Sequence, residues 1–291
     1  MTNSHASYAV FALLSAMLLN ATTDVLVKWL AVNHSILQII FFRNLFSLIP
    51  VAAVVARDGG LPSLRSNHVL LNILRALFGL ASMVLYVISF TLMPLANVIA
   101  IGFVAPLILV VLCRIFLREL VSAEQWAAVA GGCCGALIIV QPDYGVLQWR
   151  ALLPVAGAFF LAVYMLLLRI LSRTETRSSL IAYFPVVSII CTGAALPWVA
   201  TTPDRIDFLL LVITGCIGGI ALYLRNEAYT AAPASVLAPC EYTGLLWVAI
   251  FGVVVFGDNL SRQLFIGATI LIGTNLFVLL RVSTLSSRKA T

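Results

Sequence analysis

Ionisable side chains inside otherwise apolar stretches are the residues of this sequence best suited to chemistry. A charged group is costly to bury in apolar surroundings, so each one needs a partner, a proton or a water-filled cavity. Such groups hold ion pairs, carry protons or recognise a charged solute. The candidates for a gate or an ion pair are Asp24, Lys28, Arg43, Arg75, Arg225 and Glu227, and Glu241 joins them as a candidate for solute contact.

Asp24 and Lys28 are four residues apart in the first apolar stretch, so they share one face of a helix. We expect them to form an ion pair within that helix, with a role in energy coupling as the alternative. Arg43 and Asn44 enter the second apolar stretch from the same side. These two side chains are expected to join the same network.

A second set of charges lies near the opposite ends of the apolar stretches and contains Arg75, Arg225, Glu227 and Glu241. Glu241 lies about seven residues inside its predicted helix, or about 10 Å from the helix start at 1.5 Å per residue. We expect it to pair with Arg75 or Arg225, as a gate or as a static tie, or to contact a solute amine. Asp24, Glu227 or Glu241 could carry a proton, although downhill transport needs none.

The composition identifies the surroundings of these charges as a membrane. Hydrophobic residues make up 62% of the 291 positions and charged residues only 10%, whereas a soluble domain carries about 25% charged residues. A spanning helix needs about 20 apolar residues. The sequence therefore predicts an all-α membrane protein with ten spans, at 8–30, 36–56, 69–92, 95–114, 124–141, 150–170, 179–200, 207–229, 234–256 and 262–281.

Lys and Arg residues are divided unevenly between the two faces predicted for these spans. With a cytoplasmic amino terminus, eleven basic residues fall on the cytoplasmic side and three on the other. Basic residues accumulate on the cytoplasmic side of membrane proteins, so we expect both termini there. The net charge of +6 is scattered singly rather than clustered, which argues against binding of nucleic acid.

An internal repeat divides the chain in two. Residues 75–140 reappear in degraded form at 214–279, shifted by 139 positions. Each half holds five predicted spans, an odd number, so the second half enters the membrane upside down relative to the first. We predict two inverted five-helix repeats, 8–141 and 150–281, followed by a cytoplasmic tail at 282–291. Inverted repeats are typical of transporters that work by alternating access.

Prolines interrupt the fourth and ninth predicted spans at related places. Pro94 and Pro233 begin these spans, and Pro106 and Pro239 fall inside them. A proline frees a backbone carbonyl, which a membrane tolerates only where protein or cavity water can satisfy it. We therefore place a solute cavity among the third, fourth, eighth and ninth spans, with the first and sixth beside it.

Aromatic and polar side chains of these spans are candidates to line the cavity. Rings suit stacking with an aromatic or aliphatic solute, and amides and hydroxyls suit its polar end. Packing or lipid contact is the alternative for each ring. The candidates for solute binding are Asn20, Ser82, Tyr86, Phe90, Asn97, Phe103, Tyr164, Tyr229, Ser235, Glu241, Tyr242 and Trp247.

An enzyme, a cofactor or a metal site is not expected. Intramembrane proteolysis needs paired aspartates or a Ser/His arrangement, but Asp24 is the only aspartate in the interior of a predicted span, Asp207 standing at the first position of its span, and no histidine lies in one. The six cysteines form no CxxC pair, and no nucleotide-binding loop is present. A facilitative channel is the alternative of another class, although an inverted repeat favours a carrier.

Two GxxxG spacings, Gly131/Gly135 and Gly215/Gly219, permit helices to approach closely. We expect them to pack within the fold rather than between two copies of the chain. The expected state is a monomer, with a dimer as the alternative.

Two stretches carry a family resemblance. ANVIAIGFVAPL (96–107), LRE (117–119) and GGCCGALIIVQP (131–142) resemble the first EamA unit of the drug/metabolite transporter superfamily, and PASVLAPCEYTGLLW (233–247) with VFGD (255–258) resembles the second. Asp258 stands where the family commonly has Glu.

The resemblance implies a ten-helix carrier of the bacterial inner membrane that needs no cofactor. In general appearance the chain is similar to exporters of aromatic and neutral amino acids, so export of small amphipathic metabolites, amino acids first, is the expected function. A carrier of drugs, nucleotide sugars or other metabolites on the same fold is the alternative.

Overall fold

The computed structural model describes residues 3–118, 123–140, 149–231, 240 and 243–274. Within these ranges every regular element is a helix and no strand occurs. The prediction of an all-helical fold is confirmed for this part of the chain.

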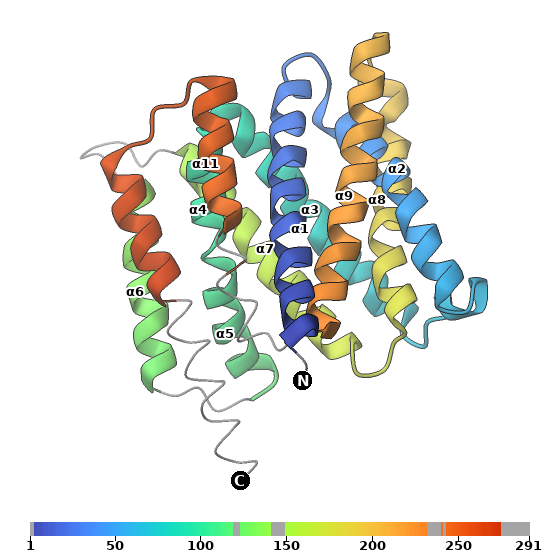
Figure 1. Ribbon diagram of the computed structural model, residues 1–291, viewed down its shortest axis with the longest axis horizontal. Coiled ribbons are helices and arrows are strands. Elements are labelled where there is room, and N and C mark those ends of the chain that lie inside the picture. The colour runs from blue at the N-terminus through green and yellow to red at the C-terminus, as the bar shows by residue number, and fades with distance from the viewer. Residues whose placement is uncertain (1–2, 119–122, 141–148, 232–239, 241–242, 275–291) are drawn as a thin grey trace.

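The helices follow one another with short connections (Figure 1). In chain order they are α1 (Asn3–Leu30), α2 (Ile36–Arg57), the 3-10 helix η1 (Leu61–Leu64), α3 (Val69–Leu92), α4 (Leu95–Gly102), α5 (Ala105–Phe116), α6 (Ala123–Val140), α7 (Trp149–Leu171), α8 (Arg177–Val199), α9 (Arg205–Ala231) and α11 (Thr243–Phe256). A further helix covers 262–274.

Seven described segments are long and apolar enough to cross a membrane, and they match seven of the predicted spans to within a few residues. They are Ser7–Leu30, Ile36–Arg57, Val69–Leu92, Leu95–Phe116, Trp149–Leu171, Arg177–Val199 and Arg205–Arg225. Two shorter apolar helices, Val129–Ile139 and Thr243–Phe256, fall within two other predicted spans. The chain is therefore a multi-pass membrane protein. The count of ten spans and the division into two repeats stay predictions.

Polar side chains fix where individual helices begin. The Ser35 hydroxyl accepts the backbone N–H of Gln38 at the start of α2 (3.2 Å), and the Thr176 hydroxyl accepts that of Ser179 at the start of α8 (3.2 Å). Each bond satisfies one N–H that has no partner inside its helix. The helix over 262–274 begins in the same way, with the Ser261 hydroxyl accepting from the backbone of Leu264.

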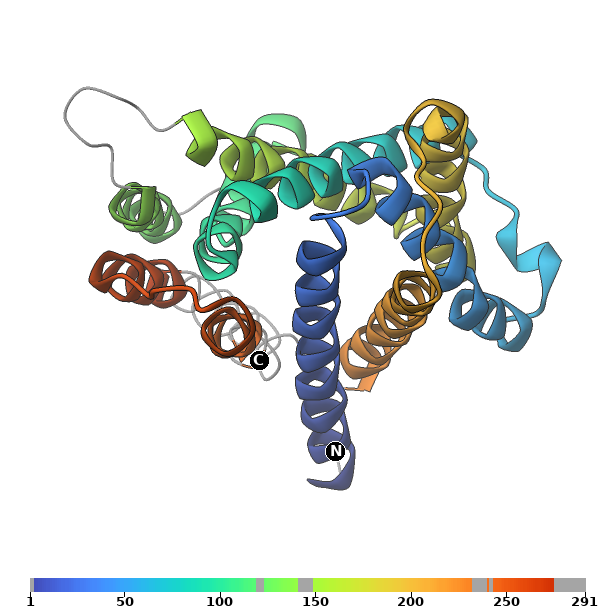
Figure 2. The same ribbon diagram turned by 90° about the horizontal axis from the view of Figure 1, so that it is seen from above.

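The helices pack around a central α1. Seen from above, α1 passes through the middle of the bundle, with α2, α8 and α9 to one side and α11 with the 262–274 helix to the other (Figure 2). Helix α1 packs on α9 and α11, α3 packs on α7 and α8, and α2 packs on α8 and α9. Helix α1 begins at the lower face in Figure 1, and the 262–274 helix runs toward that same face.

The fourth predicted span is broken where its internal proline lies. Helix α4 ends at Gly102 and α5 begins at Ala105, with Pro106 in the first turn of α5. Proline has no N–H to donate and its ring clashes with the carbonyl four residues earlier, here that of Gly102. Phe103 and Val104 bridge the break with tight i to i−3 bonds. The predicted interruption at Pro106 is confirmed, whereas Pro239 lies outside the described residues.

The GxxxG spacing on α9 brings two backbones together inside the fold. A Cβ added at Gly215 would come 2.8 Å from the Arg43 carbonyl oxygen, and one added at Gly219 would come 3.0 Å from that of Ser47. Gly135 on α6 makes the same kind of approach to the backbone of Gly267. The interpretation of these glycines as packing residues within the chain is confirmed, because only a missing side chain permits such contact.

Candidate solute cavity

Two connected hollows lie at the centre of the bundle. One has a volume of about 480 Å³ and the other about 490 Å³. We call the first the basic arm and the second the aromatic arm, after their walls. The side chains that line both arms come from α1, α2, α7, α8 and α9, and are Asn20, Arg43, Tyr164, Phe184 and Arg225. The arms therefore form a single cavity and join where these five residues meet.

The basic arm is positively charged. Among the described residues its wall carries Arg43, Arg75, Arg177 and Arg225 against the single acid Glu175. The other polar wall residues are Asn20, Asn44, Ser47, Tyr164 and Ser172. This balance favours a solute that brings negative charge or hydrogen-bond acceptors into the arm.

Arg75 is the most deeply buried of these arginines, with 0% of its surface exposed. Its Nη2 donates to the Leu180 carbonyl of α8 (2.7 Å), and its guanidinium lies 5.1 Å from the centre of the Tyr164 ring. Tyr164 also interacts electrostatically with it. Nevertheless Nε and Nη1 have no partner with hydrogen-bond geometry in the described part of the chain.

Glu175 lies at the turn between α7 and α8 and holds the start of α3. Its Oε1 accepts the backbone N–H groups of Asn67 (3.0 Å) and His68 (2.9 Å), and its Oε2 accepts the Ser179 hydroxyl (3.2 Å). Burial raises the pKa of this carboxyl, but these hydrogen bonds, together with one from Ser66, outweigh it and hold the pKa below its ordinary value. The charge of Glu175 is thus used at the N-terminus of α3, where a carboxylate is favoured.

An ion pair lies at the side of the basic arm. Arg177 Nη2 lies 3.0 Å from Glu227 Oε1 and ties the start of α8 to α9. At the next residue, the Ser178 hydroxyl donates to Asp58 Oδ2 beyond the end of α2 (2.9 Å). Glu227 was grouped with Arg75 and Arg225 as charges at the same ends of the spans, and the structure shows Arg177 as a partner of it.

The aromatic arm is lined by rings and apolar side chains from α3, α4, α5, α7 and α8. Its rings are Tyr86, Phe90, Phe103, Tyr164 and Phe184. Tyr164 and Phe184 meet edge to face, with centroids 6.0 Å apart. Such walls suit a flat ring, because aromatic pairs gain from offset or edge contacts beyond the area they bury.

Two hydroxyls in the aromatic arm differ in what they can offer. The Ser82 hydroxyl donates to the Gly157 carbonyl (2.8 Å) and so ties α3 to α7. The Tyr86 hydroxyl is buried without a hydrogen-bond partner in the described part of the chain. It lies against Gly102 at the end of α4. Tyr86 is therefore the better placed of the two to bond a solute.

Asp24 faces Arg43 where the arms join. The two side chains interact electrostatically, and Asp24 lines the aromatic arm. Lys28, one turn away on α1, does not pair with Asp24. Its Nζ lies 3.2 Å from Asp258 Oδ2 and 4.3 Å from the centre of the Phe256 ring. The expected Asp24–Lys28 pair is wrong, because Asp258 on the connection after α11 competes successfully for the ammonium group.

Asp258 also ties helices together at the end of the bundle remote from the basic arm. Its Oδ2 accepts the backbone N–H of Leu95 at the start of α4 (3.3 Å) in addition to Lys28. One carboxylate thus joins α1, α4 and α11. At the same end, His34 bonds Asp207 (2.7 Å) and Thr201 (2.9 Å), which links the α1–α2 and α8–α9 connections.

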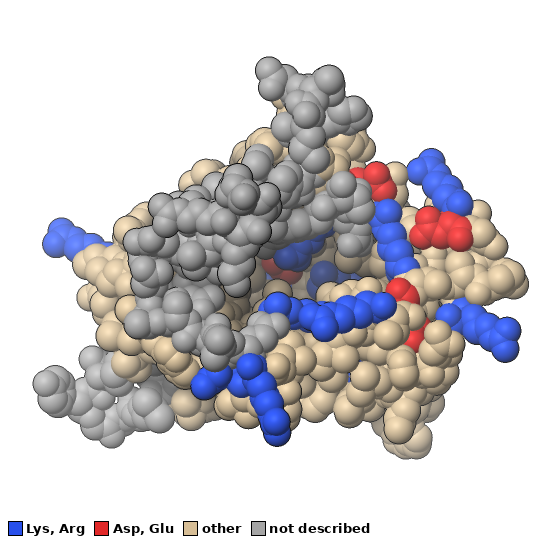
Figure 3. All heavy atoms as spheres, turned by 90° about the horizontal axis from the view of Figure 1, so that it is seen from below, with Lys and Arg blue, Asp and Glu red and all other residues tan. Residues whose placement is uncertain are grey.

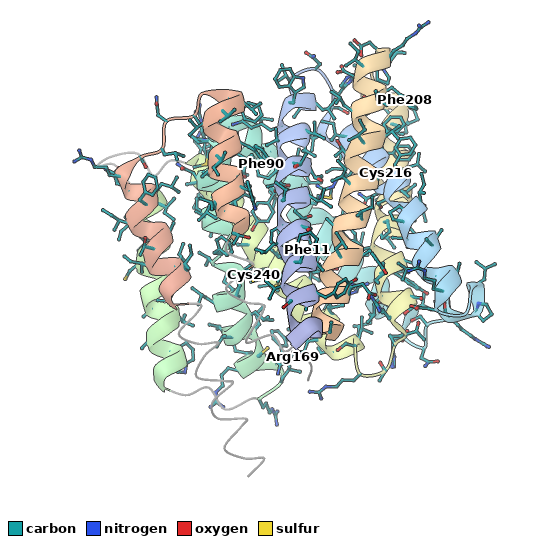
Figure 4. The ribbon with its side chains drawn as sticks, viewed as in Figure 1. Phe11, Phe90, Arg169, Phe208, Cys216 and Cys240 are labelled. Carbon is teal, nitrogen blue, oxygen red and sulfur yellow. The ribbon has the colours of Figure 1, made fainter. Side chains whose placement is uncertain are left out.

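The opposite end is hollow. Seen from below, the surface dips near the middle, and atoms of both basic and acidic residues are visible inside (Figure 3). Phe90, in the aromatic arm, lies in the upper part of the bundle, whereas Arg169, next to the basic-arm residue Leu168, lies near its lower end (Figure 4). The basic arm therefore lies toward the hollow lower end, and the aromatic arm extends from it toward the upper part of the bundle.

The structure brings most of the described candidates together. Asn20, Ser82, Tyr86, Phe90, Phe103 and Tyr164, with Asp24, Arg43, Arg75 and Arg225, line the cavity. Asn97 and Trp247 are not among the residues that line it; Trp247 packs against the hydrophobic core instead. The side chain of Tyr229 and residues Ser235, Glu241 and Tyr242 lie outside the description.

Helices α2 and α8 were missed as walls of the cavity. Sequence reasoning placed it among the third, fourth, eighth and ninth spans, yet Arg43 and Ser47 of α2 and Phe184 of α8 also line it. The sequence could have indicated α2 as a cavity wall, because Arg43 lies inside an apolar span. It could not have indicated α8 through Phe184, because a ring in an apolar helix is usually a packing residue.

Comparison with known proteins is consistent with this geometry. Residues 7–141 match the sequence model of the EamA-like transporter family. A riboflavin transporter of Brucella anthropi is 29% identical over 280 residues, covering 93% of this chain and 97% of that protein. An S-adenosylmethionine uptake transporter of Rickettsia bellii is 25% identical over 278 residues, covering 95% and 94%.

A solved crystal structure shares the fold, with a TM-score of 0.65 and 19% identity over 96% of this chain and 99% of that one. The two named relatives are transporters rather than enzymes, and neither is named as an amino-acid exporter. The apolar spans and these similarities lead to one conclusion: residues 7–141 are similar to the EamA-like transporter family, and nearly the whole chain is similar to proteins named as transporters.

Proposed function

We propose that this protein is a secondary carrier for a small solute made of a flat heteroaromatic ring and a polar tail. The observation that carries the proposal is the division of one cavity into an aromatic arm and a basic arm. A ring finds stacking partners in the first, and acceptor groups of the tail find arginine donors in the second. A purely apolar drug would leave the unpartnered donors of Arg75 unpaired.

The names of the relatives support this class of solute. Riboflavin and S-adenosylmethionine, named for the two transporters above, both join a heteroaromatic ring system to a long polar chain. The volume of each arm, about 480 and 490 Å³, falls within the range of known small-molecule sites. Riboflavin is accordingly the first solute to test.

Alternating access between two inverted five-helix repeats is the mechanism we propose. Two extensive pairings, α1 with α9 and α3 with α7, exchange with each other when the first repeat is laid on the second, which supports the repeat. Asp258 ties Lys28 of α1 to Leu95 of α4 at the end remote from the basic arm. In the proposed mechanism these bonds form the closed gate of a carrier, which a facilitative channel does not need.

Export of aromatic amino acids is the second candidate. It is favoured by the same pairing of rings with arginines, because an aromatic amino acid carries a ring and a carboxylate. The direction of transport separates the candidates as much as the solute does. Export would place the basic arm on the cytoplasmic side, as the predicted orientation of the termini requires.

Counterflow in proteoliposomes tests the proposal. Vesicles preloaded with unlabelled riboflavin are expected to accumulate labelled riboflavin transiently, and preloading with tryptophan tests the second candidate. Flux that does not saturate and shows no counterflow would reject a carrier.

A matched pair of variants ties transport to the aromatic arm. Phe103→Ala removes a ring from its wall and is expected to raise the KM for riboflavin about fivefold, because stacking on one ring contributes about 1 kcal/mol. Phe11→Ala removes a ring from the outer surface of α1, where 72% of the side chain is exposed, and is expected to leave KM unchanged. Equal effects of the two variants would dismiss the aromatic arm as the ring site.

A further inference from the structure

Arg75 holds hydrogen-bond donors that the described protein leaves unused. The side chain is fully buried in the wall of the basic arm, and two of its three nitrogens, Nε and Nη1, have no hydrogen-bond partner there. A guanidinium is always charged. An unpaired charge with unsatisfied donors opposes folding unless something else compensates.

The acids nearest in the fold are already engaged. Glu175 accepts from the start of α3 and from Ser179, and Glu227 pairs with Arg177. Asp24 lines the other arm beside Arg43. Within the described residues, no carboxylate forms an ion pair with Arg75.

The position of Arg75 is fixed rather than adaptable. Nη2 is held by the Leu180 carbonyl at 2.7 Å, and the Tyr164 ring lies against the guanidinium at 5.1 Å. Tyr164 in turn borders both arms. A solute whose ring enters the aromatic arm therefore brings its tail past Tyr164 toward Arg75.

We infer that Arg75 binds an anionic group of the solute, a carboxylate or a phosphate, whose ring lies in the aromatic arm. This inference rests on the proposed function and narrows its substrate class: the tail is charged rather than merely polar. Arg43 and Arg225, at the junction of the arms, add to the positive potential that the tail meets on its way.

Two pairs of probes test the charge of the tail while keeping the ring constant. Riboflavin 5′-phosphate is compared with riboflavin, and N-acetyltryptophan with N-acetyltryptophanamide. Affinity is measured with the purified full-length transporter in detergent. A hydrogen-bonded charge pair predicts at least about tenfold tighter binding of the anionic member of one pair. The pair that shows the preference identifies phosphate or carboxylate as the anion.

Arg75→Gln is expected to abolish that preference, so that the anionic and neutral members bind equally. Arg75→Lys keeps the charge, loses the planar donors and is expected to retain a reduced preference. Arg57→Gln removes one positive charge from an exposed arginine outside the cavity that bonds Tyr223, and is expected to retain the full preference. Each result is the ratio of the affinities of one variant for the anionic and the neutral probe. A loss of active protein lowers binding of both probes equally and leaves this ratio unchanged.

Three results overturn the inference. One is equal binding of both members of each pair by the unchanged protein. Another is a preference that survives in Arg75→Gln. A third is an unchanged protein without preference that gains one in Glu241→Gln, which would assign the guanidinium to Glu241. Binding of neither ring by any variant rejects the proposed function itself, and the inference with it.

Discussion

The two arms of the cavity are alike in volume but are built differently. The basic arm is held by hydrogen bonds and ion pairs at the ends of helices, such as Glu175 at the start of α3 and Arg177 with Glu227. The aromatic arm is held by side-chain packing beside a broken helix, α4 and α5. In the proposed site, the charged group of the solute meets helix ends that are held by hydrogen bonds and ion pairs. Its ring meets the span that is broken between α4 and α5.

Close packing of α2 on α9 supports both arms, and breaking it gives the largest expected effect. Gly219→Ala places a methyl group 3.0 Å from the Ser47 carbonyl oxygen and against Pro50. We expect destabilisation by about 3 kcal/mol, measured by thermal unfolding in detergent, because overpacking forces backbones apart. Gly273→Ala, where a Cβ meets nothing within 4 Å, is the control and should be neutral or slightly stabilising. Equal changes would contradict the account.

Tyr164 belongs to both arms, so its removal tests whether they act together. Tyr164→Leu loses the edge contact with Phe184 and the ring over Arg75, interactions that contribute about 1 kcal/mol each. We expect the affinity for riboflavin to fall about tenfold or more, measured by equilibrium binding. Tyr164→Phe should keep most of it. Tyr183→Leu makes the same change on α8 away from the described cavity walls; a similar loss there would remove Tyr164 from the site.

The ion pair between Lys28 and Asp258 lies at the end of the bundle remote from the basic arm, and breaking it tests whether the two ends are held differently. Lys28→Met and Asp258→Asn each remove one charge from a pair whose side chains are 14% exposed. A double-mutant cycle should show a coupling of about 1 kcal/mol in thermal stability. Each single change should also raise labelling of a cysteine at Phe90 by a membrane-impermeant reagent added at the closed end. Additive effects and unchanged labelling would show that the pair does not hold this end shut.

The smallest effect is expected from acid. The pKa of Glu175 is lower in the folded protein than its ordinary value, so its carboxylate stabilises the fold above the ordinary pKa. That stabilisation is lost as pH falls through the lowered folded value. Glu175→Gln should therefore reduce stability at neutral pH and flatten the dependence of thermal unfolding on pH in the acid range. An unchanged acid profile would mean that the bonds to Asn67 and His68 do not depend on charge.

Hydropathy was sufficient to predict the architecture of the described residues. Seven spans follow from apolar length alone, and the break at Pro106 follows from the missing N–H of proline. The close approach at Gly215 and Gly219 also follows, because small residues four apart have one obvious use in an apolar helix. These features are local, and local sequence carries them.

Partners of charged residues were predicted poorly. Asp24 is four residues from Lys28, but the ammonium group pairs with Asp258, which is 230 positions away along the chain. Glu227 likewise pairs with Arg177. Sequence spacing reports only contacts along one helix, whereas the choice between two possible partners depends on how α1, α9 and α11 lie together. The same reason explains why α2 and α8 were not expected as cavity walls.

Helix α4 spans only eight residues, or about 12 Å, between two points of support. At one end the backbone N–H of Leu95 donates to Asp258 Oδ2, and at the other end the chain turns at Phe103. Ile99 and Gly102 between them touch the deep part of the hollow. The segment is thus one short rigid element, so a displacement at Gly102 is transmitted directly to the bond between Leu95 and Asp258.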